Sequence, residues 1–398
     1  MYDIIIIGGG IVGLSAALHI KKKNSKLRVL ILEKENQIAK HQTGHNSGVI
    51  HSGIYYKPGS LKAINCKAGY GKLIQFCNEN EIKIDLCGKI IVATEKEELP
   101  LMNGIYDRGI ANGLLGLKRI NAQEIKEIEP HCSGVGGIWV PQTGIVDYKE
   151  ISQKYADLFL QLGGEILFEQ NVQQIMSLGN SSEIQTQNKH FEARLIINCA
   201  GLYSDKVAKM TNTELDVQIL PFRGEYFNIK KEKEYLVKNL IYPVPNPNFP
   251  FLGVHFTRMV HGGVEAGPNA VLAFAREGYT NKTVNWKELF ETLGHSGFQK
   301  VALKYWKDGM YEMYRSYSKT AFTKALQRLV PEIQKEDLEI GGAGVRAQAC
   351  DSKGNLSDDF LIFENKNIIN ICNAPSPAAT SSLSIGENIA NLALKKYN

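Results

Sequence analysis

The chain begins with an apolar run, then glycines, then a helical pattern of apolar residues. Residues 2–7 (YDIIII) predict a buried strand, residues 8–10 (GGG) a turn and residues 11–23 a helix. Residues 27–35 (LRVLILEKE) form a second apolar run that ends in acid. This order predicts a strand–turn–helix–strand unit at the beginning of the chain.

Glycines stand in this unit where a dinucleotide-binding turn needs them. Gly8 permits the tight turn, Gly10 lets the backbone approach a pyrophosphate, and Gly13 lets the helix pack closely on the strand. The start of the helix would face the phosphates. Glu33, 20 residues beyond Gly13, could accept hydrogen bonds from ribose hydroxyls. A glycine pattern of purely structural origin is the alternative, but strand, helix, second strand and acid together favour dinucleotide binding.

Strand-like runs return only far along the chain, at residues 194–201 and 368–373. A nicotinamide enzyme usually continues with alternating strands and helices. Here a Gly-, Ser- and His-rich segment and a long stretch of different texture intervene. Since a cofactor domain assembled from separated pieces is typical of FAD proteins, we predict FAD as the cofactor.

The two later pieces have features that suit a flavin. In 195–205 (LIINCAGLYSD), small residues would let the chain cross near the adenosine, although a buried strand with an ordinary glycine stop explains them too. In 372–396, two prolines and Thr380 precede a helical pattern. Backbone N–H groups at that helix start would face an electron-rich ring carbonyl. The alternative is a terminal helix that is merely initiated by proline.

Composition sets broad limits on the function. The 398 residues are enough for two lobes, and the 43% hydrophobic and 22% charged fractions are those of a soluble globular protein. The net charge of +5 favours anionic substrates or an acidic membrane surface but is too small to indicate nucleic acid. Seven cysteines without metal-ligand spacing predict reduced thiols, no metal site and an intracellular protein. We find no apolar run of about 18 residues and, because of 2–7, expect no signal peptide.

Residues 45–56 (HNSGVIHSGIYY) place histidines, tyrosines and an asparagine among small residues, without any charge. A surface loop is one reading; a segment that passes a large flat ligand is the other. With this segment included, the chain resembles the FAD-dependent L-2-hydroxyglutarate oxidases and dehydrogenases, within the D-amino-acid oxidase and glycerol-3-phosphate dehydrogenase superfamily. The likeness runs almost from end to end, and its motifs are HQTGHNSGVIHSGIYY (41–56), NCAGLYSD (198–205), PFRGEYF (221–227), GVHFTR (253–258), GGVEAGPNAVLAF (262–274), GAGVRAQ (342–348) and NAPSPAATSS (373–382).

The resemblance implies an α/β fold: a Rossmann-like FAD-binding domain built from separated segments, and a mixed-sheet α+β substrate domain, as in D-amino-acid oxidase. We expect residues 1–75, 148–212 and 336–398 to form the FAD-binding domain, and residues 76–147 and 213–335 the substrate domain. Asp147 reads as the N-cap of a helix that starts near Tyr148.

The resemblance also implies the reaction. L-2-hydroxyglutarate would be oxidised to 2-oxoglutarate by hydride transfer to flavin N5, with the electrons passed to a respiratory quinone or to O₂. An FAD-dependent amine or amino-acid oxidase on the same fold is the alternative. A non-enzymatic FAD-binding chaperone or tRNA-modification partner is a third reading, which the histidines and arginines at the expected flavin site disfavour.

Removal of the hydroxyl proton needs a base that titrates near neutral pH. In the resemblance, His51 aligns with the segment that passes the flavin, so we predict that His51 is the base or polarises the substrate hydroxyl. His255 could supplement or replace it. Either histidine could instead bond FAD or a neighbouring carbonyl, which is our expectation for His45. Tyr55 could donate to a substrate carboxylate or simply pack.

A dicarboxylate substrate needs cations, and the planar fork of arginine suits a carboxylate best. We predict Arg346, at the end of a Gly-rich strand, as the first candidate, followed by Arg223 and Arg258. Each of the three could instead form a structural salt bridge.

From the pattern and the resemblance together, we expect a set of FAD contacts along the chain. The set is Gly8, Gly10, Ile11, Val12, Gly13, Glu33, Lys34, Thr43, His45, Asn46, Ser47, Gly48, Val49, Val172, Cys199, Ala200, Gly201, Arg346, Pro377, Ala378, Ala379 and Thr380.

Residues 282–330 are helical in pattern, basic, and contain Trp306, Tyr311, Tyr314 and Tyr317. Such a face could rest on an anionic membrane, beside a quinone pool. The alternative is a helical subdomain packed on the substrate sheet with solvated charges. We therefore expect a cytoplasmic protein, with a peripheral contact to the inner membrane as the accompanying hypothesis.

Overall fold

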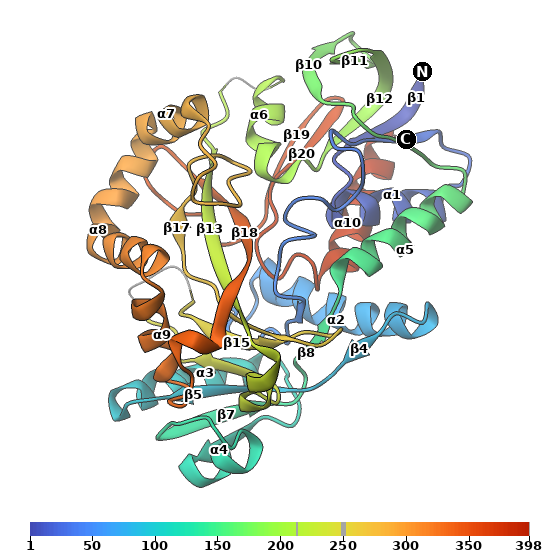
Figure 1. Ribbon diagram of the computed structural model, residues 1–398. Coiled ribbons are helices and arrows are strands. Elements are labelled where there is room, and N and C mark those ends of the chain that lie inside the picture. The colour runs from blue at the N-terminus through green and yellow to red at the C-terminus, as the bar shows by residue number, and fades with distance from the viewer. Residues whose placement is uncertain (212–213, 248–251, 398) are drawn as a thin grey trace.

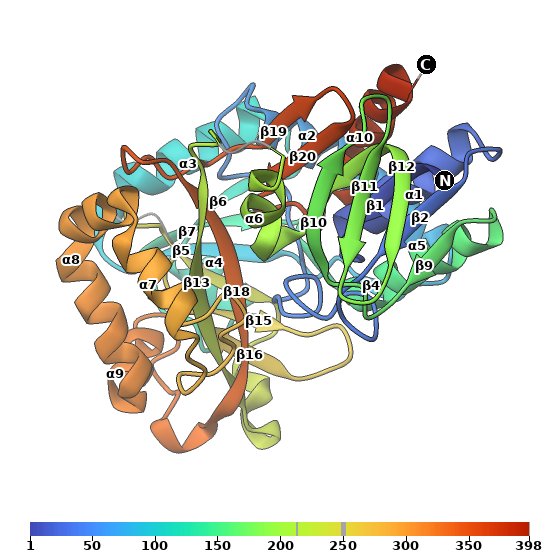
Figure 2. The same ribbon diagram turned by 90° about the horizontal axis from the view of Figure 1, so that it is seen from above.

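The first lobe is built on an eight-stranded sheet with β1 (Tyr2–Ile7) near its centre (Figures 1 and 2). The computed structural model describes residues 1–211, 214–247 and 252–397. β1 pairs in parallel with strands on both sides, and residues 4–7 are buried because both faces of the sheet are covered. The strands lie in the order β10 (Val172–Ser177), β11 (Ser182–Thr186), β12 (His190–Asn198), β1, β2 (Val29–Leu32) and β9 (Glu165–Leu167), with β20 (Ile368–Asn373) also paired to β12 and β19 (Leu361–Asn365) paired to β20.

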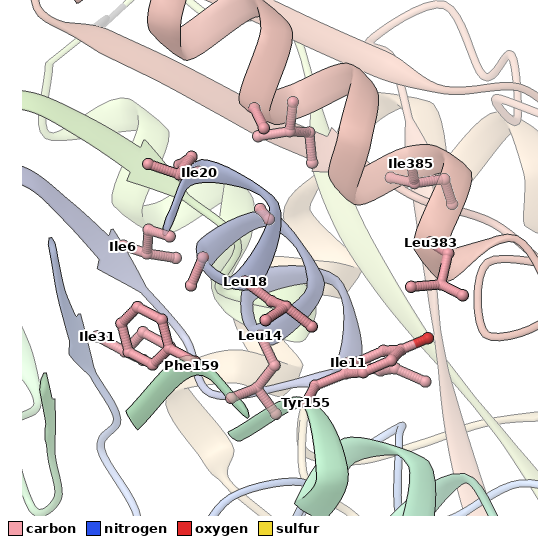
Figure 3. Packing of buried hydrophobic residues seen from close by; sticks show 14 of the residues in the cluster. Ile6, Ile11, Leu14, Leu18, Ile20, Ile31, Tyr155, Phe159, Leu383 and Ile385 are labelled. Atoms are coloured by element: carbon pink, nitrogen blue, oxygen red, sulfur yellow. The ribbon is translucent and has the colours of Figure 1, made fainter. Parts of the chain in front are cut away.

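Three helices pack on one face of this sheet: α1 (Ile11–Lys23), α5 (Tyr148–Gln161) and α10 (Ser382–Tyr397). Figure 3 shows Leu14 and Leu18 of α1 beside the aromatic rings of α5, with the apolar side chains of α10 on the other side. α1 is apolar on several sides because it is enclosed by the sheet and both helices. Full burial of each large side chain contributes about 1.5–3 kcal/mol. α5 begins as the sequence predicts: Asp147 accepts from the N–H of Lys149 at 2.7 Å, and this cap is confirmed.

The second lobe contains a mixed nine-stranded sheet, in which β14 and β5 run parallel and the other neighbours antiparallel. The strands lie in the order β17 (Val271–Leu272), β13 (Gln218–Ile229), β16 (Val264–Gly267), β15 (His255–Arg258), β14 (Leu240–Pro243), β5 (Lys89–Ala93), β7 (Gly136–Val140) and β6 (Lys118–Asn121), with β18 (Leu338–Cys350) paired along β13.

Helices α7 (Trp286–Gly294), α8 (Ser296–Tyr317) and α9 (Lys319–Gln327) lie along the outer side of the second lobe, away from α1 and α10 in both views (Figures 1 and 2). α9 is anchored by the buried Phe322 and Leu326, which join the core around Phe256. The remaining elements are α2 (Leu61–Glu79), α3 (Leu99–Ala111), α4 (Ala122–Ile128), α6 (Ser204–Lys209), the small sheet β3 (Val49–Ile50), β8 (Gly144–Val146) and β4 (Ile84–Asp85), and the 3₁₀ turns Lys96–Glu98, Gly201–Tyr203, Lys231–Leu236 and Lys335–Asp337.

The predicted α/β fold with a mixed second sheet is confirmed. The expected domain limits differ from the sheets at two places. Residues 338–350, expected in the FAD-binding domain, pair along β13 in the second lobe, and β4 and β8, expected in the substrate domain, form a sheet with β3 of the expected FAD-binding domain. The register sets Arg346 opposite Phe222 and Cys350 opposite Gln218. A Gly-rich strand carries no local signal for its distant partner, so sequence could not place it. The expected limit at 212–213 and the terminal residue 398 lie outside the described residues.

Candidate active site

A cavity of about 520 Å³ is lined by segments that are far apart in the sequence. They are the glycine turn, the segment that follows β2, the ends of β12 and β20, and the start of α10. Most of the expected FAD contacts line it, namely Gly8, Gly10, Ile11, Val12, Glu33, Lys34, Thr43, Asn46, Ser47, Val49, Val172, Cys199, Ala200, Gly201, Pro377, Ala378, Ala379 and Thr380. A lining drawn from segments this far apart in the chain suits an extended dinucleotide.

The glycine turn forms a cradle that side chains would fill. Gly8 has φ +110°, and a Cβ there would lie 2.5 Å from the carbonyl oxygen of Cys199. A Cβ on Gly13 would lie 2.2 Å from the carbonyl oxygen of Gly8, so this glycine supports the turn without lining the cavity. α1 has no side-chain cap at Gly10. The N-terminal N–H groups of a helix without such a cap fit a diphosphate.

The carboxylate of Glu33 ties the end of β2 to the glycine turn. Its two oxygens accept from the backbone N–H groups of Gly9 at 2.7 Å and of Glu35 at 2.9 Å, and the side chain is buried at the cavity wall. Carboxylate oxygens have further lone pairs. Glu33 therefore could still accept hydrogen bonds from ribose hydroxyls, and this contact stays a prediction.

A charged cluster that the sequence did not reveal closes one part of the cavity. Lys34 forms ion pairs with Glu277 and Glu35, and His41 Nε2 lies 2.9 Å from a carboxylate oxygen of Glu35. The hydroxyl of Tyr279 lies 3.1 Å from His41 Nδ1. Glu277 and Tyr279 come from the segment after β17, so the cluster joins the two lobes beside the cavity.

His45 also joins the lobes instead of lining the cavity. Its Nδ1–H donates to the carbonyl oxygen of Ala343 at 3.0 Å, and its ring stacks on Tyr279 with centroids 4.1 Å apart. His45 thus bonds a neighbouring backbone carbonyl, which is one of the two roles that we expected for it. Gly48 lies outside the lining as well; with φ +66° and Val146 O 2.6 Å from a built Cβ, it serves the close backbone approach.

His51 lies in the cavity wall at a fixed backbone position. Its N–H donates to the hydroxyl of Thr380 at 3.1 Å, and its carbonyl oxygen accepts from Cys66 Sγ at 3.3 Å. Burial, aided by the positive charge of Lys89, lowers the pKa of His51 to about 3. The imidazole is therefore neutral at physiological pH and able to accept a proton.

His255 lies close enough to His51 for its charge to lower the pKa of His51. Its ring stacks on Tyr242 with centroids 3.8 Å apart, and its Nδ1–H donates to the carbonyl oxygen of Gly253 at 2.9 Å. A carbonyl only accepts, so Nε2 carries the lone pair. Burial lowers the pKa of His255 to about 3, with the charges of Arg346 and Lys89 acting in the same direction.

Arg346 belongs to the same group of side chains, although it is not among those that line the cavity. Burial lowers the pKa of Arg346, and the tyrosines 226 and 242 are close enough to oppose that effect. Guanidinium remains charged at any physiological pH. The structure thus brings His51, His255 and Arg346 together.

The other two arginines occupy structural positions. Arg223 is buried, lies 2.8 Å from a carboxylate oxygen of Glu225, and donates to the carbonyl oxygen of Thr280 at 3.1 Å. Arg258 forms an ion pair with Asp85. Since alternate strand residues face opposite sides, Arg258 points away from the side that His255 occupies. Both arginines therefore form structural salt bridges, which was the alternative to substrate binding, and neither is retained as a ligand of a substrate carboxylate.

Sequence reasoning missed Lys89 and Tyr242, whereas Tyr55, the other tyrosine beside Lys89, was already a candidate donor to a substrate carboxylate. The signal was present in 89–93 (KIIVA): a charge at the first position of an otherwise apolar buried strand. Lys89 Nζ lies 4.7 Å from the ring centre of Tyr55 and 4.9 Å from that of Tyr242.

The model of the family described as FAD dependent oxidoreductase matches residues 3–392 of the chain. A protein of Indibacter alkaliphilus named L-2-hydroxyglutarate dehydrogenase is 61% identical over all of both chains, and one of the same name from Escherichia coli K12 is 45% identical over 98% of this chain and 93% of its own. The reduced L-α-glycerophosphate oxidase of Mycoplasma pneumoniae with FAD bound superposes with a TM-score of 0.80 at 22% identity, over 99% of this chain and 94% of that one. With a cavity that fits the cofactor and a family model that spans nearly every residue, the chain belongs to the FAD-dependent oxidoreductases.

Proposed function

We propose that the enzyme oxidises L-2-hydroxyglutarate to 2-oxoglutarate. The observation that carries this proposal is that His51, in the wall of the FAD cavity, lies near His255, which in turn lies near Arg346, in a chain whose full-length relatives carry the name of that hydroxy acid. A carboxylate, a hydroxyl and a proton acceptor are the groups that such a substrate requires. The same relatives favour a hydroxy acid over the amine and amino-acid alternative.

The guanidinium of Arg346 would bind the carboxylate next to the reacting carbon, because its fork matches two carboxylate oxygens. His51, in the cavity wall, would take the hydroxyl proton. Its pKa of about 3 describes the protein without a dianion nearby, and the substrate's negative charge would raise it. His255, whose Nε2 carries a lone pair, is the alternative acceptor of that proton. When bound, FAD supplies the two-electron acceptor.

Anaerobic reduction of the flavin tests this function directly. The purified holoenzyme is mixed under nitrogen with L-2-hydroxyglutarate, its D-enantiomer, L-lactate, glycine or sarcosine, and the absorbance of oxidised flavin is followed. We expect rapid bleaching by L-2-hydroxyglutarate alone. Bleaching by glycine or sarcosine instead would establish the amine-oxidase alternative.

We further propose that the electrons leave at a membrane. α7 and α8 expose apolar side chains at spacings of three and four residues: Trp286, Phe290 and Leu293 on the first helix, and Leu303, Trp306, Met310, Tyr314 and Tyr317 on the second, which is kinked at Tyr305. Trp286, Phe290, Leu303 and Met310 are 65%, 66%, 78% and 66% exposed. A row of exposed apolar side chains of this kind favours an interaction site.

The charges around these apolar side chains favour an anionic bilayer over a protein partner. Lys287, Lys300, Lys304 and Lys307 are exposed on the same two helices. Lysines beside tryptophan and tyrosine suit the headgroup region of a membrane. No helix in the described part of the chain is long and apolar enough to cross a bilayer. We therefore propose a peripheral contact through α7 and α8 and a quinone as electron acceptor, with O₂ as the slower alternative.

A further inference from the structure

Lys89 is a buried cation whose position the proposed reaction has not explained. It is the first residue of β5 and is 1% exposed. Its ammonium lies between the rings of Tyr55 and Tyr242, at 4.7 and 4.9 Å from their centres. Among the described residues, no carboxylate forms an ion pair with it. Lysine is almost never fully buried without a partner, because desolvation of its charge is unfavourable.

A second polar group in the same place also lacks a partner. The hydroxyl of Tyr55 is buried, and it makes no hydrogen bond to any described residue. Most buried hydroxyls in folded proteins are hydrogen-bonded, so an unsatisfied one beside a functional site indicates a ligand. An ammonium and a phenol hydroxyl both donate, and an anion with oxygen acceptors would satisfy both.

This pair of donors lies beside the residues of the proposed reaction. The charge of Lys89 lowers the pKa of His51 and of His255, and the charge of Arg346 also acts on His255. Two cations on different strands, Lys89 on β5 and Arg346 on β18, therefore act on the same histidine, His255. Since Arg346 is assigned to the carboxylate next to the reacting carbon, Lys89 would face a second anionic group of the same substrate.

We propose that Lys89 and Tyr55 form a second carboxylate subsite, which binds the far carboxylate of a dicarboxylic 2-hydroxy acid and selects it over monocarboxylic analogues. This inference rests on the proposed function and adds to it the residues that determine chain-end specificity. The tyrosine rings hold the ammonium in place by cation–π contact while the site awaits substrate. A methyl group at the substrate's far end would leave the ammonium and the phenol unsatisfied, and such mismatches are strongly discriminated.

Binding of two unreactive acids tests the subsite apart from the chemistry. Glutarate and pentanoate have the same chain length but differ by one carboxylate, and neither has a hydroxyl to oxidise. Their dissociation constants are measured by titration calorimetry on the FAD-loaded full-length enzyme. The variants are Lys89→Met, which removes the charge at similar volume, Tyr55→Phe, and as matched control Lys118→Met, an exposed lysine on β6 of the same sheet.

The wild type should bind glutarate at least about 10-fold more tightly than pentanoate. Lys89→Met should weaken the binding of glutarate about 10- to 100-fold and leave the binding of pentanoate nearly unchanged. Tyr55→Phe should weaken the binding of glutarate about 3- to 10-fold, again with little effect on pentanoate. In turnover, kcat/KM for L-2-hydroxyglutarate relative to L-2-hydroxypentanoate should fall in parallel. Equal loss for both acids in Lys89→Met and Tyr55→Phe, or no loss in either, would overturn the subsite.

The carboxylate subsite and the proposed reaction can be tested independently of each other. If L-2-hydroxyglutarate bleaches the flavin and both variants keep their preference for glutarate, the reaction stands and the subsite falls. If the hydroxy acid does not bleach the flavin but glutarate still depends on Lys89 and Tyr55, the subsite stands and the reaction must be another one on a dicarboxylate. Should Lys89→Met lose FAD, Tyr55→Phe alone decides, because it removes one hydroxyl and keeps the ring.

Discussion

The backbone N–H of His51 donates to the hydroxyl of Thr380 at 3.1 Å, although 329 positions separate the two residues in the chain. The same hydroxyl is hydrogen-bonded to that of Tyr148 at 2.8 Å. The start of α10 thereby fixes the segment that carries His51 to the cavity wall. The position of the proposed base depends on this tie between distant segments.

Replacement of Thr380 by valine should release that tie while it preserves the shape of the side chain. A buried N–H left without an acceptor costs about 1–3 kcal/mol. We expect a lower melting temperature and slower flavin reduction, measured by calorimetry and anaerobic stopped flow. Thr380→Ser keeps the hydroxyl and should retain most of both properties. Normal stability and rate in the valine variant would mean that the segment is held by other contacts.

His51→Ala should slow flavin reduction far more than it weakens FAD retention. Loss of a positioned general base typically costs about 10²- to 10⁴-fold in rate. The rate is measured by single-turnover reduction at saturating substrate, and retention by the FAD content after dialysis. His45→Ala is the control, because His45 bonds a backbone carbonyl outside the cavity. Equal losses of rate and FAD in His51→Ala would make this histidine a cofactor contact only.

Arg346→Lys should raise the KM for L-2-hydroxyglutarate, because lysine keeps the charge but loses the bidentate geometry. An increase of about 10-fold or more in KM is expected from steady-state kinetics. Arg223→Lys provides the comparison: its side chain is ion-paired with Glu225, so its effect should appear in the melting temperature instead. Unchanged kinetics in Arg346→Lys would remove this residue from the substrate site.

Burial lowers the pKa of Lys89 to about 7, and this shift makes a prediction about stability without substrate. Below pH 7 the folded protein carries a desolvated charge. Between pH 7 and about 10 the unfolded state binds more protons at this residue, so the free energy of unfolding should rise with pH, by at most about 1.4 kcal/mol per pH unit. Because lysine in the unfolded chain has a pKa near 10.4, the contribution levels off above that pH.

Lys89→Met isolates this effect from other titrations. Tyr55, Tyr242, Cys66, His51 and His255 face the ammonium; burial raises the pKa of the tyrosines and the cysteine and lowers that of the histidines, so none of them titrates between pH 7 and 9 in the folded state. Urea unfolding of the wild type and of the variant at pH 7, 8 and 9 should show the variant more stable at pH 7, by about 1–3 kcal/mol, with the difference shrinking as pH rises. A difference that does not change with pH would contradict the assignment.

The α7–α8 face should bind anionic vesicles. Leu303→Glu combined with Trp306→Glu places two acids among the exposed apolar side chains and should reduce co-sedimentation with phosphatidylglycerol-containing vesicles about 10-fold or more. Leu115→Glu is the matched control, since Leu115 is also an exposed leucine, 73% accessible, but follows α3 elsewhere on the second lobe. Equal binding by all variants, or none by the wild type, would remove the membrane contact.

The sequence by itself determined the local elements of the first lobe. The run 2–7, the glycine turn and α1 follow from apolar periodicity and from the need for backbone without Cβ, both of which act within a few residues. The cap at Asp147 is equally local. The segments near the cavity were found because small residues, histidines and prolines are unusual in composition there.

Only the tertiary structure decided which charged side chains meet. Arg223, Arg258 and Arg346 each lie in a motif of the same character, yet Arg223 pairs with Glu225 on its own strand and Arg258 pairs with Asp85 on β4. Arg346 instead lies near His255, and its charge acts on that histidine.

In the sequence Lys89 is a charge at the start of an apolar run, and its burial between two tyrosines depends on how β5 and β14 pair. Periodicity indicates which side of a helix or strand is apolar. The position of a buried charge such as Lys89 depends on strand register and on packing between segments that are distant in the chain. No local sequence pattern encodes this packing.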